Sequence, residues 1–398
     1  MTNKRVTKRR VFFIGGYEPI TADNFFSRMT RELKRFEATW DATAVLSPSQ
    51  RADAGHSTTA WFTTNLADNR IETEFTFLAL DDIVLADFAK PIWIRLGLYL
   101  RAFFDNVITG TLNKFFMNSW RVALFFLYPP FLLAVFACIA IIAATLVSSL
   151  GFPGSDLAAA LIGIAVFVAL LRYPGDRLIL AHLMDLWSFL RSYVHRRTRR
   201  VDSRIKHWAQ EVATCACNGQ FDEILLIGHS TGGALILDVA ATAFAIDSPK
   251  VSENTKITIL TVGSIALSVG LHPAAGWFRT KVQKLSRQHR ISWVEYQALE
   301  DVINFYKTDP FTEMKLESDR KEPFPIVEPV RIRKMLQSDF YNRIMRNYIR
   351  VHYQFIMAND RRYKYDFCMI CFGPFLLSDT VRDRYDRLDL YDTDTADS

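Results

Sequence analysis

The feature that most constrains this chain is a run without charged residues at 122–150. Its length of about 29 positions exceeds the roughly 20 apolar residues that a helix needs to cross a bilayer. Pro129 and Pro130 lie near its start, where they indicate a kink or an entry turn and not the centre of a span. The sequence therefore predicts a transmembrane helix over about 122–150.

A second apolar segment, at 157–171, follows a short connector rich in turn-forming residues. Its small residues, such as Ala158 and Gly163, suit close packing between helices. Fifteen or so residues are few for a span, but Tyr173 and a tilted or thinned bilayer complete a predicted helix over about 157–173. The soluble alternative is a helical hairpin buried in a large core.

Lysine and arginine flank the two segments on both sides and are absent from the connector at 151–156. Under the positive-inside rule both flanks face the cytoplasm, at an inner or plasma membrane, and can form one domain. The net charge is +6, concentrated near the N-terminus and at 191–206. Basic charge beside apolar segments favours an anionic bilayer, and not nucleic acid, as the partner.

The expected organisation has four parts. Residues 1–90 and 211–378 form one globular domain, 91–210 form a membrane insertion with its flanks, and 379–398 form a polar tail expected to be disordered. Within the insertion, 91–101 and 178–193 mix aromatic residues, leucine and arginine. This pattern is equally typical of helices in the headgroup region and of ordinary helices packed on a core.

The sequence Gly228-His229-Ser230-Thr231-Gly232 has the pattern G-x-S-x-G. An apolar, strand-like stretch (221–227) precedes it, and an alanine- and leucine-rich helical stretch (233–241) follows it. A serine in such a strand–turn–helix element has its hydroxyl exposed at the end of a sheet, beside a helix N-terminus that favours negative charge. Ser230 is therefore the candidate nucleophile. The alternative is a glycine- and serine-containing turn without chemistry.

The rest of the chain alternates between strand and helix patterns, which predicts an α/β fold with a mostly parallel, doubly wound sheet. Predicted helices lie at about 22–36 and 277–287. Predicted strands lie at 10–17, 43–46, 75–80, 256–262 and 291–296.

A nucleophilic serine needs a base and an acid that orients the base, and in this fold type the order along the chain is Ser, acid, His. Three histidines follow Ser230. His272 precedes every acid candidate, at a predicted strand exit, and His289 lies in a solvated basic turn. His352 follows the acids and is the predicted base, although a locally bonded helical histidine is the alternative, because 339–358 has a helical pattern.

Asp301 is the predicted acid, because it follows the strand at 291–296 after a short loop and its apolar neighbours turn that loop inward. Glu300 and Asp309 are the other candidates, and any of the three can instead be a helix cap or a surface charge. His229 is expected to be a packing residue whose side chain leaves the turn on the face opposite the base.

Two backbone amides must stabilise the oxyanion of a tetrahedral intermediate. Thr231, directly after the nucleophile, supplies the first. Gly16 or Tyr17, in the glycine turn after the first strand, is expected to supply the second. A Gly-Gly turn without any such role is the alternative.

The five cysteines indicate neither a disulfide framework nor a metal site. Cys138 lies inside an apolar run, and the spacing of Cys215 and Cys217 does not fit the usual zinc knuckles. Cys368 and Cys371 lie in an apolar, strand-like run. We therefore expect no metal.

On the elbow sequence, the glycine turn and the order Ser230, Asp301, His352, the chain resembles the α/β-hydrolase superfamily, particularly its lipase and esterase branch. The resemblance covers most of the chain outside about 90–210. It implies hydrolysis of an ester or thioester bond without metal or organic cofactor. Together with the membrane segments, it predicts a membrane-anchored serine hydrolase acting on an acyl ester or lipid-like substrate, with acyl transfer left open. A non-catalytic membrane scaffold that binds lipid or a partner on the same fold is the alternative.

Overall fold

The computed structural model describes residues 5–52, 56–245 and 251–382. The chain divides into two compact units, which we call the sheet unit (Met1–Leu85 with Val194–Ser398) and the helical unit (Ala86–Tyr193). The helical unit is inserted between the fifth and sixth strands of the sheet unit.

The sheet unit contains a mixed sheet of nine strands in the order β2-β4-β5-β1-β6-β7-β8-β9, with β3 paired to β4. The six strands from β5 to β9 along this order are mutually parallel, whereas β2, β3 and β4 pair antiparallel. The predicted α/β class with a mostly parallel sheet is thus confirmed. The strands are β1 Lys8–Ile14, β2 Thr43–Leu46, β3 Gln50–Arg51, β4 Ser57–Leu66, β5 Asn69–Leu78, β6 Glu223–His229, β7 Lys256–Val262, β8 Ile291–Ala298 and β9 Ile326–Val330.

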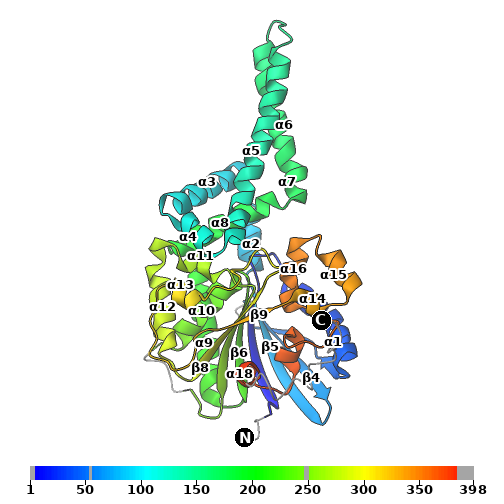
Figure 1. The fold of residues 1–398 in the computed structure, drawn as a ribbon, viewed down its shortest axis with the longest axis vertical. Helices are drawn as coiled ribbons and strands as arrows, with labels where there is room; N and C mark the ends of the chain where they lie inside the picture. The colour runs from blue at the N-terminus through cyan, green and yellow to red at the C-terminus, as the bar shows by residue number, and fades with distance from the viewer. Residues whose placement is uncertain (1–4, 53–55, 246–250, 383–398) are drawn as a thin grey trace. The chain divides into compact units, whose positions relative to one another are not determined.

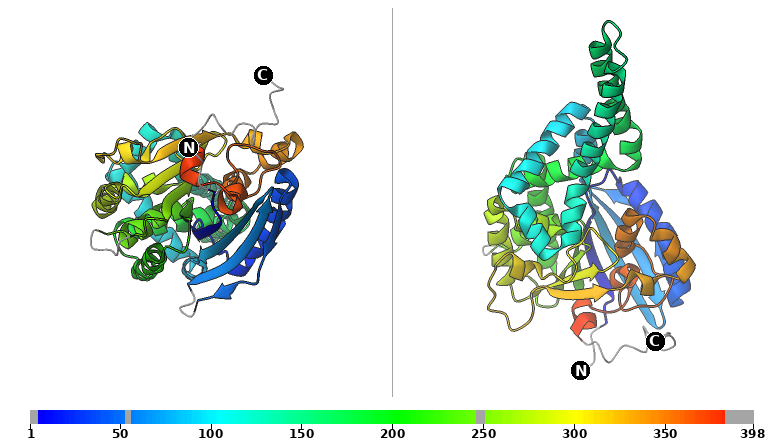
Figure 2. Two further views of the ribbon diagram at one scale, coloured as in Figure 1. Left: turned by 90° about the horizontal axis from the view of Figure 1, so that it is seen from below. Right: turned by 45° about the horizontal axis from the view of Figure 1, so that its top comes forward.

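Helices cover both faces of this sheet (Figures 1 and 2). Side chains alternate between the faces along β1, so that Val11 and Phe13 pack in a core with α1, while Phe12 and Ile14 face the other side. The helices of this unit are α1 Ala22–Trp40, α2 Asp81–Phe88 (which runs on into the helical unit), α9 Arg199–Asn218, α10 Gly232–Ala243, α11 Ala266–Gly270, α12 Gly276–Ser286, α13 Pro310–Glu313, α14 Ile332–Met335, α15 Ser338–Ile344, α16 Tyr348–Tyr353, α17 Phe367–Phe372 and α18 Leu377–Arg382, with 3-10 turns η1 Pro273–Ala275 and η2 Gln354–Ile356.

The connections leave β1 in two directions, and this creates a topological switch point between β1 and β6. The chain between β1 and β5 builds the sheet on one side of β1, and the chain from β6 to β9 builds it on the other. Ile14 pairs with Gly228 in the register, so β1 and β6 end side by side. In open α/β sheets ligands bind outside the carboxyl ends of the strands at such a point.

Several sequence predictions are corrected here. The strands β3, β4 and β9 were not predicted, and the helical pattern at 339–358 is broken into α15, α16 and η2. Cys368 and Cys371 lie in a helix and not in a strand, because Asp366 caps α17 by accepting hydrogen bonds from the amides of Cys368 and Met369. Of the tail predicted to be disordered, 379–382 belong to α18, and 383–398 lie outside the described residues.

The helical unit contains two helices long and apolar enough to cross a membrane by length and composition. Their most apolar 18-residue windows have mean hydropathies of 2.7 and 2.0, and only 17% and 11% of these windows are buried. A hairpin in a soluble core would be mostly buried, so the exposure favours a lipid environment. The helices of this unit are α3 Ile92–Ile108, α4 Thr111–Asn118, α5 Trp120–Ser148, α6 Ser155–Arg172, α7 Pro174–Arg177 and α8 Leu180–Val194.

The prolines of α5 mark a change of environment and not a break. The helix is continuous through Pro129 and Pro130. Val122 and Phe126 before them are fully buried, whereas Phe131 after them is 65% exposed. The 18 residues of α5 beyond the prolines (131–148) lie within the range of roughly 17 to 25 residues that spans a bilayer.

The two flanking segments have different environments. In α8, Leu183 and Trp187 are buried, as expected for a helix packed on a core. In α3, Tyr99 and Ala102 are buried, while other large apolar side chains such as Phe104 are exposed. The basic run that ends at Lys206 lies partly in α9 of the sheet unit.

Candidate active site

Ser230 lies in a sharp turn between β6 and α10, with a backbone φ of +57°. Positive φ is sterically unfavourable for any residue with a Cβ, so the surroundings must hold the turn. They do so through three backbone hydrogen bonds. The Ser230 amide donates to the carbonyl oxygen of Val262 (3.2 Å), and the Ser230 carbonyl oxygen accepts from the amides of Gly233 (3.0 Å) and Ile265 (3.2 Å).

The glycines around Ser230 are required by close backbone packing. A Cβ at Gly228 would overlap the carbonyl group of Gly232, and a Cβ at Gly232 would overlap the carbonyl oxygens of Ile14 and Gly15. The start of α10 is therefore packed directly on the end of β1. This contact brings the glycine turn after β1 next to Ser230.

The Gly232→Ala variant is expected to destabilise the sheet unit by about 3 kcal/mol, because backbone oxygens on a central strand cannot move aside. Thermal unfolding of the purified protein, followed by near-ultraviolet circular dichroism, measures this. Gly276→Ala is the matched control, since a Cβ there meets only Arg279 Nη2 at 3.8 Å. Equal melting temperatures for the two variants would contradict the packing argument.

Asp301 and His352 form a buried pair. Asp301 Oδ2 lies 2.8 Å from His352 Nδ1, and Asp301 Oδ1 accepts a hydrogen bond from the Ile303 amide at 2.9 Å. Asp301 is 0% exposed and His352 is 3% exposed. Since the carboxylate contacts Nδ1, the imidazole is oriented with Nε2 as its available nitrogen.

His352 Nε2 is buried and has no hydrogen-bond partner among the described residues. The hydrogen bond from Ser230 to His352 is therefore not formed in this structure, although both residues lie at the end of β7. The Ser230 amide bonds to Val262, the last residue of β7. A Cβ at the next residue, Gly263, would lie 3.0 Å from His352 Cε1. In enzymes without substrate, a hydrogen bond between a nucleophile and its base is often long and shortens only on binding.

The other two acid candidates have different places. Asp309 caps α13 by accepting hydrogen bonds from the amides of Phe311 and Thr312. Glu300 has a buried Oε2 without a hydrogen-bond partner among the described residues. Of the three acids, Asp301 is the one that the structure places against His352.

His229 packs against His352, and not on the opposite face as expected from the sequence. The two ring centroids are 4.5 Å apart, and His229 Nε2 lies 3.2 Å from the His352 carbonyl oxygen. Burial lowers the pKa of His229 well below its usual value, so the ring stays neutral at physiological pH. A neutral imidazole supports His352 without adding charge beside it.

The expected oxyanion donors lie around Ser230, with one difference. A Cβ at Gly16 would be 3.3 Å from Ser230 Cβ and 3.6 Å from its Oγ, so Gly16 is directly beside the hydroxyl. The Tyr17 amide, however, donates to Thr231 Oγ1 at 3.2 Å. Within the described chain, the amides of Gly16 and Thr231 donate no hydrogen bond to another residue. These two amides are the better candidates.

Two charged residues near Ser230 were missed. Glu18 and Arg28 line a small cavity of about 20 Å³ together with Gly15, Gly16 and His229. The Arg28 guanidinium lies 5.4 Å from the ring centroids of Phe25 and Tyr353. The sequence feature that could have identified Glu18 is its position two residues after Gly16, next to the turn predicted to donate to the oxyanion.

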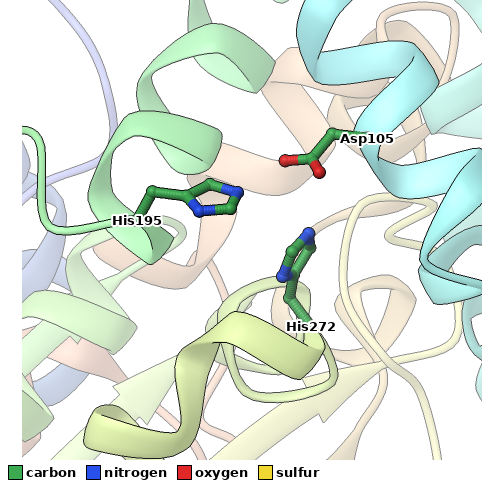
Figure 3. Close-up of side chains that lie close together, drawn as sticks. All are labelled: Asp105, His195 and His272. Carbon is green, nitrogen blue, oxygen red and sulfur yellow. The ribbon is translucent and has the colours of Figure 1, made fainter.

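Figure 3 shows another group of polar side chains. Within the sheet unit, the rings of His195 and His272 have centroids 5.3 Å apart, and His272 Nδ1 accepts from the Ala274 amide at the start of η1. His272 is thus a cap, and not at a strand exit. Asp105, also drawn, belongs to the helical unit. Two imidazoles are fewer ligands than protein zinc sites use.

No family model matches the chain, and the comparisons with curated proteins and with solved structures gave no match either.

Proposed function

We propose that the chain is a membrane-anchored serine hydrolase of the α/β-hydrolase type that cleaves an ester or thioester bond. The observation that carries the proposal is the buried Asp301–His352 pair, whose facing atoms are 2.8 Å apart. It lies at the carboxyl end of the parallel strands, where Ser230 has a positive φ. Backbone strain of this kind persists only where the surroundings hold it, and it is often found at functional sites.

The reaction follows from the roles of these groups. Ser230 Oγ attacks the acyl carbonyl carbon as His352 Nε2 takes its proton, and Asp301 stabilises the imidazolium. The amides of Thr231 and Gly16 donate hydrogen bonds to the oxyanion. Return of the proton from Nε2 to the leaving alcohol or thiol yields the acyl-enzyme. Water, or another acceptor in an acyl transferase, then releases the acyl group by the reverse sequence.

The helical unit supports a membrane location and a lipid-like substrate. Its two apolar helices would anchor the chain in the bilayer, and the basic residues on both flanks favour a cytoplasmic side for the sheet unit under the positive-inside rule. A site tethered near a bilayer meets acyl esters of lipids at high local concentration. The proposed partners are therefore the bilayer and an acyl ester or lipid-like molecule.

Labelling with a fluorophosphonate probe tests this proposal. Washed membranes containing the wild type are expected to incorporate the probe, and the labelled chain should stay in the pellet after alkaline carbonate extraction. The Ser230→Ala variant should not be labelled, because the probe reacts with an activated serine.

Ser268→Ala is the matched control for labelling. This serine is also buried, at 4% exposure, and its hydroxyl has no hydrogen-bond partner among the described residues. The control should be labelled like the wild type. A folded wild type that stays unlabelled would favour the non-catalytic scaffold, and labelling that persists in Ser230→Ala would exclude Ser230 as the nucleophile.

A further inference from the structure

The loop after β1 places a carboxyl group beside the Ser230 hydroxyl. A Cβ at Gly16 would lie 3.1 Å from Glu18 Oε1 and 3.6 Å from Ser230 Oγ. The carboxyl oxygen and the hydroxyl therefore border the same small volume above Gly16. The oxygen of a carbonyl group attacked by Ser230 is two bonds from Oγ and falls within reach of this volume.

A third hydrogen-bond donor in this volume, beside the amides of Gly16 and Thr231, would stabilise the oxyanion further. The Tyr17 amide, which the sequence offered as a donor, is directed to Thr231 Oγ1. A protonated carboxyl group is a good substitute, because its O–H donates a hydrogen bond, and a carboxyl kept neutral by its surroundings can stabilise an oxyanion. An ionised carboxylate at the same place would repel the oxyanion.

The surroundings of Glu18 favour the neutral form. Burial raises the pKa of Glu18 to about 7, against the opposing attraction of Arg28 and His352. The titratable and charged groups around it come from three elements: Arg28 from α1, His229 from β6 and His352 from α16. His229 is neutral, as described above, and Arg28 is the main group that opposes protonation of Glu18.

We propose that Glu18, in its protonated form, donates a hydrogen bond to the oxyanion at Ser230, so that its ionisation switches the site off at alkaline pH. This inference rests on the proposed function of Ser230. In the step itself the Oγ–C bond forms, the carbonyl π pair moves to oxygen, and the Ser230 proton moves to His352 Nε2. Glu18 keeps its proton throughout and contributes only the hydrogen bond.

The sign of the pH dependence follows from the protonation state. Below about pH 7 the carboxyl is protonated and donates, and above it the group becomes an anion that opposes the oxyanion. The rate is therefore expected to fall as pH rises through about 7. A carboxylate that bound a cationic leaving group would give the opposite sign, with the rate rising over the same range.

The test measures the second-order rate of fluorophosphonate labelling of the full-length protein from about pH 5.5 to about 9.5, since the phosphonyl oxygen occupies the oxyanion site. The wild-type rate should fall about tenfold per pH unit on the alkaline limb. Glu18→Gln, which keeps a donor but does not titrate, should lose this limb. Glu18→Ala should lower the rate at about pH 6 by roughly 10²- to 10³-fold.

Asp23→Asn is the matched control, because it removes an exposed carboxylate at the start of α1 and should keep the wild-type limb. An alkaline limb that persists in Glu18→Gln would overturn the role of Glu18 while leaving the nucleophile intact. A rate in Glu18→Ala equal to the wild type at about pH 6 would do the same. Absence of wild-type labelling at every pH would instead overturn the proposed function, and the role of Glu18 with it. Melting temperatures show whether each variant is folded.

Discussion

The His352→Ala variant is expected to lower kcat for an acyl ester by roughly 10⁶-fold, the scale on which loss of a catalytic histidine acts in serine hydrolases. Without the imidazole, Ser230 loses the base proposed to take its proton. Asp301 cannot substitute, because its Oδ1 is held by the Ile303 amide and it contacts the site through His352. Hydrolysis of a chromogenic short-chain ester by the detergent-solubilised protein measures the effect.

Addition of free imidazole distinguishes loss of the base from disrupted packing in the His352→Ala variant. The variant leaves a cavity where the buried ring was, so added imidazole should restore part of the rate if the loss is chemical. His289→Ala is the control, since that side chain is 63% exposed and lies on the surface. A decrease smaller than about tenfold in His352→Ala would remove this residue from the mechanism.

The sequence predicted the elements whose patterns are local. The charge-free run became α5, and the strand–turn–helix around Ser230 became β6 and α10, because length, periodicity and glycine spacing are properties of contiguous residues. The pairing of Asp301 with His352 was predicted from the order Ser, acid, His along the chain and from the place of Asp301 in a short loop after a predicted strand. Their contact spans 51 residues, and it depends on where β8 ends and on where α16 begins.

The elements that the sequence missed depend on tertiary context. β4 has adjacent threonine pairs around the run Ala60-Trp61-Phe62, so it lacks the regular polar and apolar alternation that signals a strand. β9 contains Pro329, which argues against a strand except at an edge. β9 is indeed the last strand of the order. The apolar run at Cys368 resembles a strand in composition, but the side chain of Asp366 caps it as a helix.

The site residues divide in the same way, into those predictable from local sequence and those that depend on tertiary contacts. Thr231 and Gly16 could be predicted, since one adjoins the nucleophile and the other follows a strand with glycines. The position of the His229 ring against His352 could not, because it depends on the fold of 332–356, which is far away in sequence. Glu18 was predictable only in part. Its place in the loop was visible, but its distance from Ser230 depends on the packing of Gly232 on the end of β1.

The Asp301→Asn variant is expected to lower kcat by roughly 10⁴-fold, with the fold retained, because the amide nearly matches the carboxylate in shape. The Asn Oδ1 can still accept from the Ile303 amide, at the position where Asp301 Oδ1 lies 2.9 Å from it. The amide NH₂ then faces His352 Nδ1, which must become the acceptor. The imidazole would carry its proton on Nε2 and could not take the proton of Ser230.

The melting temperature separates this effect from loss of structure. Asp301→Ala should unfold at a lower temperature than Asp301→Asn, because it leaves the Ile303 amide and His352 Nδ1 buried without a partner. Both variants should be nearly inactive. Asp309→Asn is the matched control, since it alters a helix cap 8 residues further along and should affect stability more than turnover. If Asp301→Asn retained more than about a tenth of the wild-type kcat, the tautomer of His352 would be fixed by another group, and Glu300, whose Oε2 has no hydrogen-bond partner among the described residues, would be the next acid to replace.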